Sequence, residues 1–306
     1  MTEVATPPPP LRDAAKELLS PEFLRRIEQL QLVSRKVLMG RLRGERRSKA
    51  KGTSIEFADH REYTRGDDIR HIDWNTYARL EKLFLKLFVE EQELTLHLVI
   101  DASRSMALGE PNKLLHAKRT AAALGYIALV NSDRVGIHAM RGGQLATFAP
   151  ARGRARTWAM LRFLTELEGN GTTDLAASCR TFALRQQTRG VVVLLSDLLD
   201  PHGFEGALKW FLHRNHEVYV LHLFGEDELN PRIGGHLELV DSETGDRTEV
   251  TINRPLLRRY REMLDALCTA ARDWCNAHGM VYTVTSTATD FDQLVLSHLR
   301  RRGLLR

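Results

Sequence analysis

A carboxylate and two hydroxyl side chains follow one apolar run at alternate positions, in the stretch LTLHLVIDASRSM (residues 94–106). The run ends in Asp101, and Ser103 and Ser105 come directly after it. Magnesium takes oxygen ligands in near-octahedral geometry and keeps some of its water. A buried strand that delivers these three side chains to one loop therefore provides half of a site for a hard cation.

Two segments downstream could supply the other half of such a site. Thr172 and Thr173 lie in the glycine-loosened stretch GNGTTDL, and Asp197 follows the apolar run Val191–Leu195. In open α/β sheets, ligands bind outside the carboxyl ends of the strands, where the strand order switches. We therefore expect the three segments to meet at one edge of a sheet. The plainer alternatives are helix capping or turn bonding for the serines, and capping of the following helix for Asp197.

The pattern that must position these residues is an alternation of strands and helices from residue 94 onward. Strands are predicted at 94–100, 134–140, 145–148, 191–196, 217–224 and 281–285, and helices at 113–130, 154–168, 174–187, 204–214, 255–278 and 291–301. Such alternation indicates a mostly parallel, doubly wound sheet with helices on both faces. A β-hairpin, 237–240 with 248–252, is predicted as an insertion at residues 226–253, around the turn sequence DSETGD.

The amino-terminal part of the chain has a different composition. Residues 1–19 include a four-proline run and are predicted to be a disordered lead. Ser20-Pro21-Glu22 is typical of a helix start, and apolar residues then recur at helical spacing. We expect residues 20–91 to form an amino-terminal helix and a charged segment that packs on a main domain of residues 92–306.

Charge is concentrated in the same part of the chain. Residues 1–52 hold 12 Lys and Arg against 6 Asp and Glu, whereas the whole chain has a formal net charge of +5. The basic stretch Arg41–Lys51 could bind nucleic acid or an anionic membrane surface, but it lacks the interleaved aromatic residues that stack on bases. We therefore expect this stretch to be a solvated linker that binds no nucleic acid. Peripheral contact with a membrane remains an alternative.

Cysteine content and hydropathy bear on location. The three cysteines, Cys179, Cys268 and Cys275, are at no disulfide-framework spacing, and the last two are read as small apolar residues on one helix face. No apolar stretch approaches the ~20 residues that span a bilayer. The sequence therefore predicts a soluble, cytoplasmic protein.

The spacing of the candidate ligands resembles a known site. Asp101-x-Ser103-x-Ser105, then Thr173, then Asp197 resembles the metal-ion-dependent adhesion site of von Willebrand factor A domains, which implies a Rossmann-like fold. The resemblance implies Mg²⁺, or another divalent cation such as Mn²⁺ or Ca²⁺, held by these five residues. Thr173 is preferred over Thr172 because the family's threonine stands two residues after a glycine.

A second block of sequence narrows the resemblance. The stretches EF (56–57), REYTRGDDIRHIDW (61–74) and AR (78–79), with the DSETGD turn, resemble the Domain of Unknown Function 58 family. That family carries a von Willebrand factor A domain and is commonly encoded beside MoxR-type AAA+ ATPases in bacteria. The resemblance implies a protein partner that offers an acidic residue, such as this ATPase or its client.

The resulting hypothesis is a non-enzymatic adaptor that binds protein through a metal. The alternative is a metal-dependent phosphoester hydrolase. Hydrolysis of phosphate esters usually requires two metal ions or one metal ion with a nucleophile, whereas one candidate metal cluster is visible in the sequence. No phosphate-binding loop of the G-x-x-x-x-G-K-[ST] type and no G-x-S-x-G elbow is present.

The charged segment 61–74 has two interpretations. It is either a structural clasp that pairs arginines with aspartates, which we favour, or a surface that binds a partner directly. A second metal site made of Asp67, Asp68, His71 and Asp73 is disfavoured by its loose spacing. The segment's candidate residues are Arg61, Tyr63, Gly66, Asp67, Asp68, Arg70, Asp73 and Trp74.

Overall fold

The computed structural model describes residues 18–31, 55–64, 69, 72–90, 94–186, 188–213, 215–289, 294 and 303–305, with the backbone alone at 21, 55–61 and 86–90. The chain divides into two compact units. The main unit comprises residues 1–36 and 94–306, and the small unit comprises residues 37–93.

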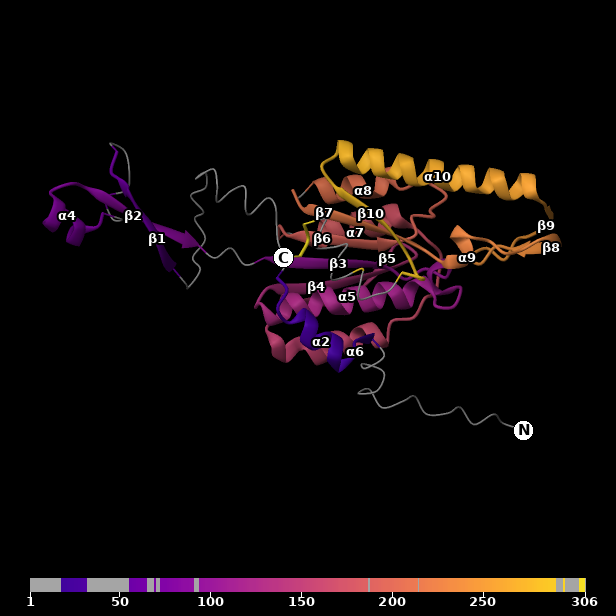
Figure 1. The fold of residues 1–306 in the computed structure, drawn as a ribbon, viewed down its shortest axis with the longest axis horizontal. Coiled ribbons are helices and arrows are strands. Elements are labelled where there is room, and N and C mark those ends of the chain that lie inside the picture. Colours follow the sequence, from indigo (N-terminus) through magenta and orange to yellow (C-terminus); the bar gives the residue numbers. More distant parts are fainter. Residues whose placement is uncertain are drawn as a thin grey trace. The chain divides into compact units, whose positions relative to one another are not determined.

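A six-stranded sheet in the order β10-β7-β6-β3-β4-β5 forms the centre of the main unit (Figure 1). Only β5 runs antiparallel to its neighbour, at one edge. Counted along the chain, this order is 6-5-4-1-2-3, the doubly wound arrangement whose switch lies between β3 and β6. The predicted doubly wound, mostly parallel α/β fold is confirmed. The strands are β3 (Thr95–Asp101), β4 (Arg134–Arg141), β5 (Gln144–Arg152), β6 (Val191–Ser196), β7 (Glu217–Phe224) and β10 (Val281–Ser286).

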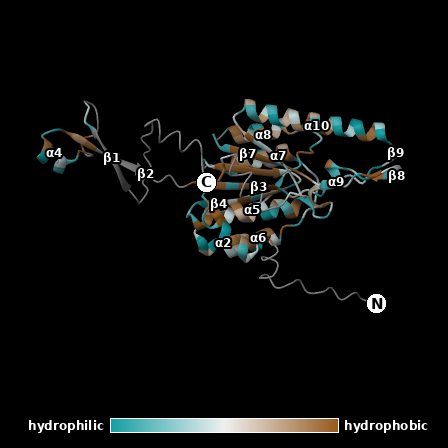
Figure 2. Ribbon diagram, viewed as in Figure 1, coloured by the Kyte–Doolittle hydropathy of each residue, from teal (hydrophilic) through white to brown (hydrophobic). Residues whose placement is uncertain are grey.

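Both faces of the sheet are covered, because successive side chains of a strand point to opposite sides. In β6, Val191, Val193 and Leu195 join one buried cluster, whereas Val192 and Leu194 join the other. Helices cover each cluster, and in Figure 2 the strands of the sheet are mostly in the brown of hydrophobic residues, whereas the helices carry both colours. On the first face lie α2 (Pro21–Ile27), α5 (Lys113–Val130) and α6 (Thr157–Thr165), and on the second lie α7 (Leu175–Arg185), α8 (Glu205–Leu212) and α10 (Arg254–Ala277).

The predicted elements of the main unit recur with small shifts at their ends. The predicted helix at 154–168 is a 3₁₀ turn, η3 (Arg154–Arg156), followed by α6, and the strand predicted at 145–148 extends over all of β5. The hairpin predicted between β7 and α10 is present as β8 (Gly235–Val240) and β9 (Arg247–Ile252), preceded by α9 (Glu226–Leu229). The helix predicted at 291–301 falls almost wholly outside the described residues.

The amino-terminal helix belongs to the main unit. Ser20 caps α2 by accepting a hydrogen bond from the Phe23 amide at 3.2 Å, as its sequence predicted. Phe23 and Ile27 are buried in the cluster that contains α5, and the Tyr126 hydroxyl donates to Glu28 Oε1 at 2.6 Å. The sequence pattern groups this helix with the charged segment in residues 20–91, whereas in the structure the helix belongs to the main unit because its apolar face is buried in the cluster that contains α5.

The charged segment lies in the small unit. Strand β1 (Ile55–Glu62) pairs antiparallel with β2 (Phe84–Glu90), and α4 (Trp74–Leu80) lies between them in sequence. Asp73 caps α4, since its Oδ1 accepts from the Asn75 amide at 3.0 Å. Trp74 is 61% exposed within its unit and contacts Tyr77 edge to face. Of the other candidates, Tyr63 is half-buried, only the backbone of Arg61 is described, and Gly66, Asp67, Asp68, Arg70 and His71 lie outside the described residues.

Two further predictions concern single features. All three cysteines are free; Cys179 and Cys275 are buried and Cys268 is half-buried. Among the described helices, none is long and apolar enough to cross a bilayer.

A group of histidines lies within the second buried cluster. His97 on β3 and His138 on β4 are fully buried, with His97 Nδ1 3.4 Å from His138 Nε2. The rings of His97 and His216 are 5.6 Å apart, and Phe182 packs edge-on against His97 and His138. Burial is the main cause that lowers the pKa of His97 to about 4 and that of His138 to about 3, with each ring's histidine neighbour adding to the effect.

This burial predicts a loss of stability in mild acid. Between pH 6.5 and about 4 the unfolded chain binds protons at these histidines and the folded chain does not, so the free energy of unfolding falls as pH falls. The expected loss from pH 7.5 to 5 is about 2 kcal/mol for each histidine. Urea titrations of the parent chain and of His138→Leu check this. From pH 7.5 to 5, the free energy of unfolding of the variant should fall by about 2 kcal/mol less than that of the parent chain. Equal losses in the two chains would contradict the prediction.

Candidate functional site

The switch in strand order brings two carboxylates to neighbouring strand ends. Asp101 is the last residue of β3, and Asp197 directly follows β6, the strand beside it. Both are buried, with 2% and 0% of their surface exposed. Ser103 and Ser105 follow on the loop after β3, and Ser105 opens a short 3₁₀ helix, η2 (Ser105–Ala107).

Backbone hydrogen bonds hold the loop before α7 against the loop after β3. The Asn170 amide donates to the Ala102 carbonyl at 3.0 Å, and the Arg104 amide donates to the Gly171 carbonyl at 3.1 Å. Gly169 permits this approach, since a Cβ there would lie 2.6 Å from Ala107 Cβ and 3.1 Å from the Ser103 carbonyl oxygen. These contacts hold the loop that carries Thr173 against the loop that carries the two serines.

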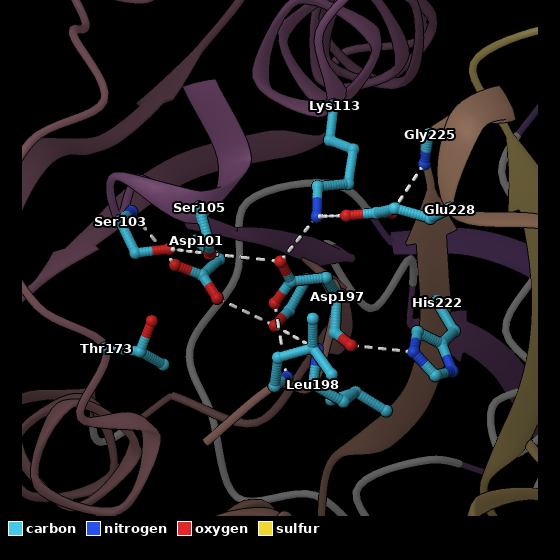
Figure 3. Close-up of polar contacts among 12 residues, drawn as sticks. Asp101, Ser103, Ser105, Lys113, Thr173, Asp197, Leu198, His222, Gly225 and Glu228 are labelled. Carbon is cyan, nitrogen blue, oxygen red and sulfur yellow. Dashed lines mark hydrogen bonds and ion pairs between the residues drawn. The ribbon is translucent and has the colours of Figure 1, made fainter. Parts of the chain in front are cut away.

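The oxygen atoms form a connected network (Figure 3). Ser103 Oγ is 3.1 Å from Ser105 Oγ, and the Ser105 hydroxyl donates to Asp197 Oδ2 at 3.0 Å. Asp101 accepts from the Ser103 amide through Oδ1 at 3.0 Å and from the Ser196 hydroxyl through Oδ2 at 2.8 Å. Figure 3 draws Thr173 on the Asp101 side of the network, with no hydrogen bond to it.

A buried lysine compensates the charge on one side of this network. Lys113, the first residue of α5, donates to Asp197 Oδ2 at 2.8 Å and also forms an ion pair with Glu228 of α9. Burial disfavours the ammonium, but the two carboxylates outweigh it, so the pKa of Lys113 lies above its usual range. Glu228 is in turn held by the Gly225 amide, which donates to its Oε2 at 2.7 Å.

The other carboxylate lacks such a partner in the described part of the chain. Burial, and then repulsion from Asp197, raise the pKa of Asp101 to about 6, against the hydrogen bonds from Ser196 and Ser103. A cation placed beside Asp101 would therefore relieve an unfavourable charge.

Thr173 has a partner that the sequence did not reveal. Its hydroxyl donates to Glu243 Oε1 at 2.6 Å, and its amide donates to Glu243 Oε2 at 2.8 Å. Glu243 lies in the turn between β8 and β9, 70 residues along the chain. The inserted hairpin thus brings a carboxylate to the edge of the oxygen network.

A histidine ties the main chain of Asp197 to the adjacent strands. His222 on β7 lies with Nε2 2.7 Å from the Asp197 carbonyl and Nδ1 2.6 Å from the Tyr282 hydroxyl of β10. Burial lowers the pKa of His222 to about 4, so the ring is neutral at pH 7. Because a carbonyl only accepts, Nε2 is the donor, and Tyr282 donates to Nδ1.

The residues at this site fit a small divalent cation. The donors are carboxylate and hydroxyl oxygens, which Mg²⁺ prefers, and adjacent ligands of an octahedral Mg²⁺ are about 3 Å apart, close to the separations along Ser103, Ser105 and Asp197. Among the described residues no group of three or more His, Cys, Asp or Glu could hold a metal. Three of the five candidate donors, Ser103, Ser105 and Thr173, offer hydroxyl oxygens.

The five candidate oxygen donors were expected from the sequence, whereas three charged neighbours were not. The structure brings Asp101, Ser103, Ser105 and Asp197 into direct contact and places Thr173 at their edge. Thr172, the alternative to Thr173, is exposed. Asp197 does not cap the following helix, because Phe204 occupies the cap of α8. Lys113, Glu228 and Glu243 carry no local signal beyond the turn that contains Glu243.

Comparison with known families agrees with the motifs read from the sequence. The family described as "Protein of unknown function DUF58" matches residues 59–267, more than half of the chain. The chain belongs to this family. An uncharacterized protein of Mycobacterium tuberculosis is 28% identical over 261 residues, which cover 83% of this chain and 80% of that protein. An uncharacterized protein of Mycobacterium bovis matches with the same figures.

Solved structures with similarity to the chain include one von Willebrand factor A (VWA) domain. The conserved hypothetical protein BatB of Bacteroides thetaiotaomicron is 14% identical, covers 68% of this chain and 98% of its own, and has a TM-score of 0.42. The VWA domain of SpRpn10 is 12% identical, with 67% and 94% covered and a TM-score of 0.38. Manganese-loaded TRAP protein of Plasmodium vivax is 14% identical, with 71% and 76% covered and a TM-score of 0.37.

The ion pairs of Lys113 predict a large stability effect. Lys113→Met keeps the length of the side chain but leaves Asp197 and Glu228 without their cation, so the free energy of unfolding should fall by about 3–5 kcal/mol. Urea titration in the presence of a chelator measures the change. Lys209→Met, at an exposed position of α8, serves as the control and should change the value by less than about 0.5 kcal/mol. A loss below about 1 kcal/mol for Lys113→Met would contradict this account.

Proposed function

We propose that this chain is a non-enzymatic, metal-dependent protein-binding adaptor. One observation carries the proposal: Asp101, Ser103, Ser105 and Asp197, from the carboxyl ends of two adjacent strands, join in one oxygen network, with Thr173 at its edge. A bound divalent cation would supply Lewis acidity and an open coordination position there. A carboxylate from a partner protein is the natural ligand for that position.

The charges around the network favour binding of an acidic group. Lys113 partly compensates Asp197, so Asp101 is the carboxylate left to balance a cation. A cation held mainly by neutral hydroxyls keeps most of its positive charge for an incoming carboxylate. The carboxylates nearby are engaged in polar contacts of their own: Glu228 with Lys113, and Glu243 with Thr173. This arrangement supports binding better than turnover.

The partner we propose is a MoxR-type AAA+ ATPase or its client. The choice rests on the family resemblance, because members are commonly encoded beside such ATPases. The adaptor would assist the assembly, activation or remodelling of a protein complex in the cytoplasm.

Loss of metal binding on a near-isosteric substitution tests the proposal. Asp101→Asn should abolish the heat of Mn²⁺ binding in titration calorimetry. It should be at least as stable as the parent chain in chelator, because the amide removes the repulsion from Asp197. Thr173→Ala is a second variant, expected to weaken Mn²⁺ binding without disturbing the buried network.

Partner binding provides the second measurement. Retention of the neighbouring MoxR-type ATPase on the immobilised chain should fall at least about tenfold with chelator or with Asp101→Asn. Asp265→Asn, at an exposed position of α10, removes a carboxylate elsewhere and should have no effect. Unchanged retention by Asp101→Asn would overturn the proposal, as would an absence of Mn²⁺ binding to the parent chain.

A further inference from the structure

The β8–β9 hairpin is an arm with little burial of its own. All six residues of β8 are exposed, and in β9 only Ile252, at its end, is buried. Leu239 and Val240 are exposed by 44% and 54%. Because apolar burial is the main source of stability for a docked element, these strands contribute little to holding the hairpin in place. The hairpin lies beside α9, past the end of the sheet where β3 and β6 finish (Figure 1).

Polar contacts at the tip, at Ser242 and Glu243, hold the hairpin in place. Glu243 accepts two hydrogen bonds from Thr173, one from the hydroxyl and one from the amide. On the neighbouring residue, the Ser242 carbonyl accepts from the Arg104 guanidinium at 3.2 Å. Both partners belong to the loops that carry the candidate metal ligands. The tip is therefore attached to the site itself and not to a separate part of the surface.

The turn also presents Glu243 in a fixed direction. Asp241 Oδ1 accepts from the amides of Glu243 and Thr244, each at 2.8 Å. These hydrogen bonds lower the pKa of Asp241 below its usual range, so the carboxylate stays charged and the turn stays closed at neutral pH. The Asp241 carbonyl accepts from the Gly245 amide at 2.9 Å, which completes the turn. A half-buried carboxylate on a preformed turn loses little conformational freedom when it binds.

We propose that Glu243 is an internal ligand of the site, which holds the position that a partner's acidic side chain takes. The inference rests on the proposed metal-dependent binding function and extends it to regulation. In the free chain the hairpin closes over the Thr173 side of the site. A partner's carboxylate binds only when Glu243 leaves, and the weakly buried hairpin can leave because few contacts besides those at its tip need to break.

The first test follows the hairpin tip by hydrogen exchange. Mn²⁺ should slow exchange of the amides at 241–246 in the parent chain, because Glu243 joins the loaded site. Glu243→Gln should remove this slowing. Glu249→Gln, which makes the same charge change at an exposed position of β9, should keep it. Binding of Mn²⁺ without any change in exchange at the tip of the parent chain would overturn the inference.

The second test measures competition with a carboxylate probe. A hexaglutamate peptide should bind Glu243→Gln at least about tenfold more tightly than the parent chain in saturating Mg²⁺, since a tethered competitor acts at millimolar or higher effective concentration. Glu249→Gln should bind the peptide within about twofold of the parent. The same peptide should speed exchange at 241–246 in the parent chain.

The outcomes separate the two proposals. If the parent chain does not bind Mn²⁺, the metal-dependent function itself fails. If Mn²⁺ binds but the peptide binds Glu243→Gln and the parent equally, or binds neither, the internal ligand is overturned while the metal site stands.

Discussion

Two like charges buried side by side are the constraint around which the rest of this site is arranged. Asp101 and Asp197 lie at the ends of adjacent strands, almost without exposed surface, where each disfavours the charge of the other. This cost is compensated unequally: a lysine from α5 pairs with Asp197, whereas the partners of Asp101 among the described residues are hydroxyl and amide donors. Asp101 is the member of the pair without a compensating cation in the described part of the chain, and this asymmetry marks where a bound cation would be stabilised.

Much of the fold and of the oxygen set could be predicted because both depend on local pattern. Alternating strands and helices indicate a doubly wound sheet, and such a sheet brings the ends of β3 and β6 together whatever the details of packing. Asp101, Ser103 and Asp197 stand directly at those ends. Their convergence follows from topology, and it required no knowledge of which side chains touch.

The charged neighbours could not be predicted for the same reason. Lys113 is the first residue of a helix whose start is predictable from its Asn112 cap, but nothing in that start indicates that the lysine pairs with Glu228, 115 residues away. Their pairing depends on how α5 and α9 approach the same strand end, which no local pattern encodes. The same holds for the amino-terminal helix. Ser20 predicts where the helix starts, but its place in the main unit depends on packing against the apolar surface of α5, which no local pattern encodes.

The hydrogen bonds of His222 have a consequence for which parts of the candidate metal site can move when a partner binds. The imidazole of His222 on β7 links Tyr282 of β10 to the residue that follows β6. The Asp197 carbonyl can only accept, which fixes Nε2 as a donor and Nδ1 as an acceptor. The peptide carbonyl of Asp197 is therefore hydrogen-bonded to a buried side chain, which is itself held by Tyr282. We therefore expect rearrangements of the site to involve the loops that carry Ser103 and Thr173, which are joined to each other by backbone hydrogen bonds, more than the main chain at Asp197.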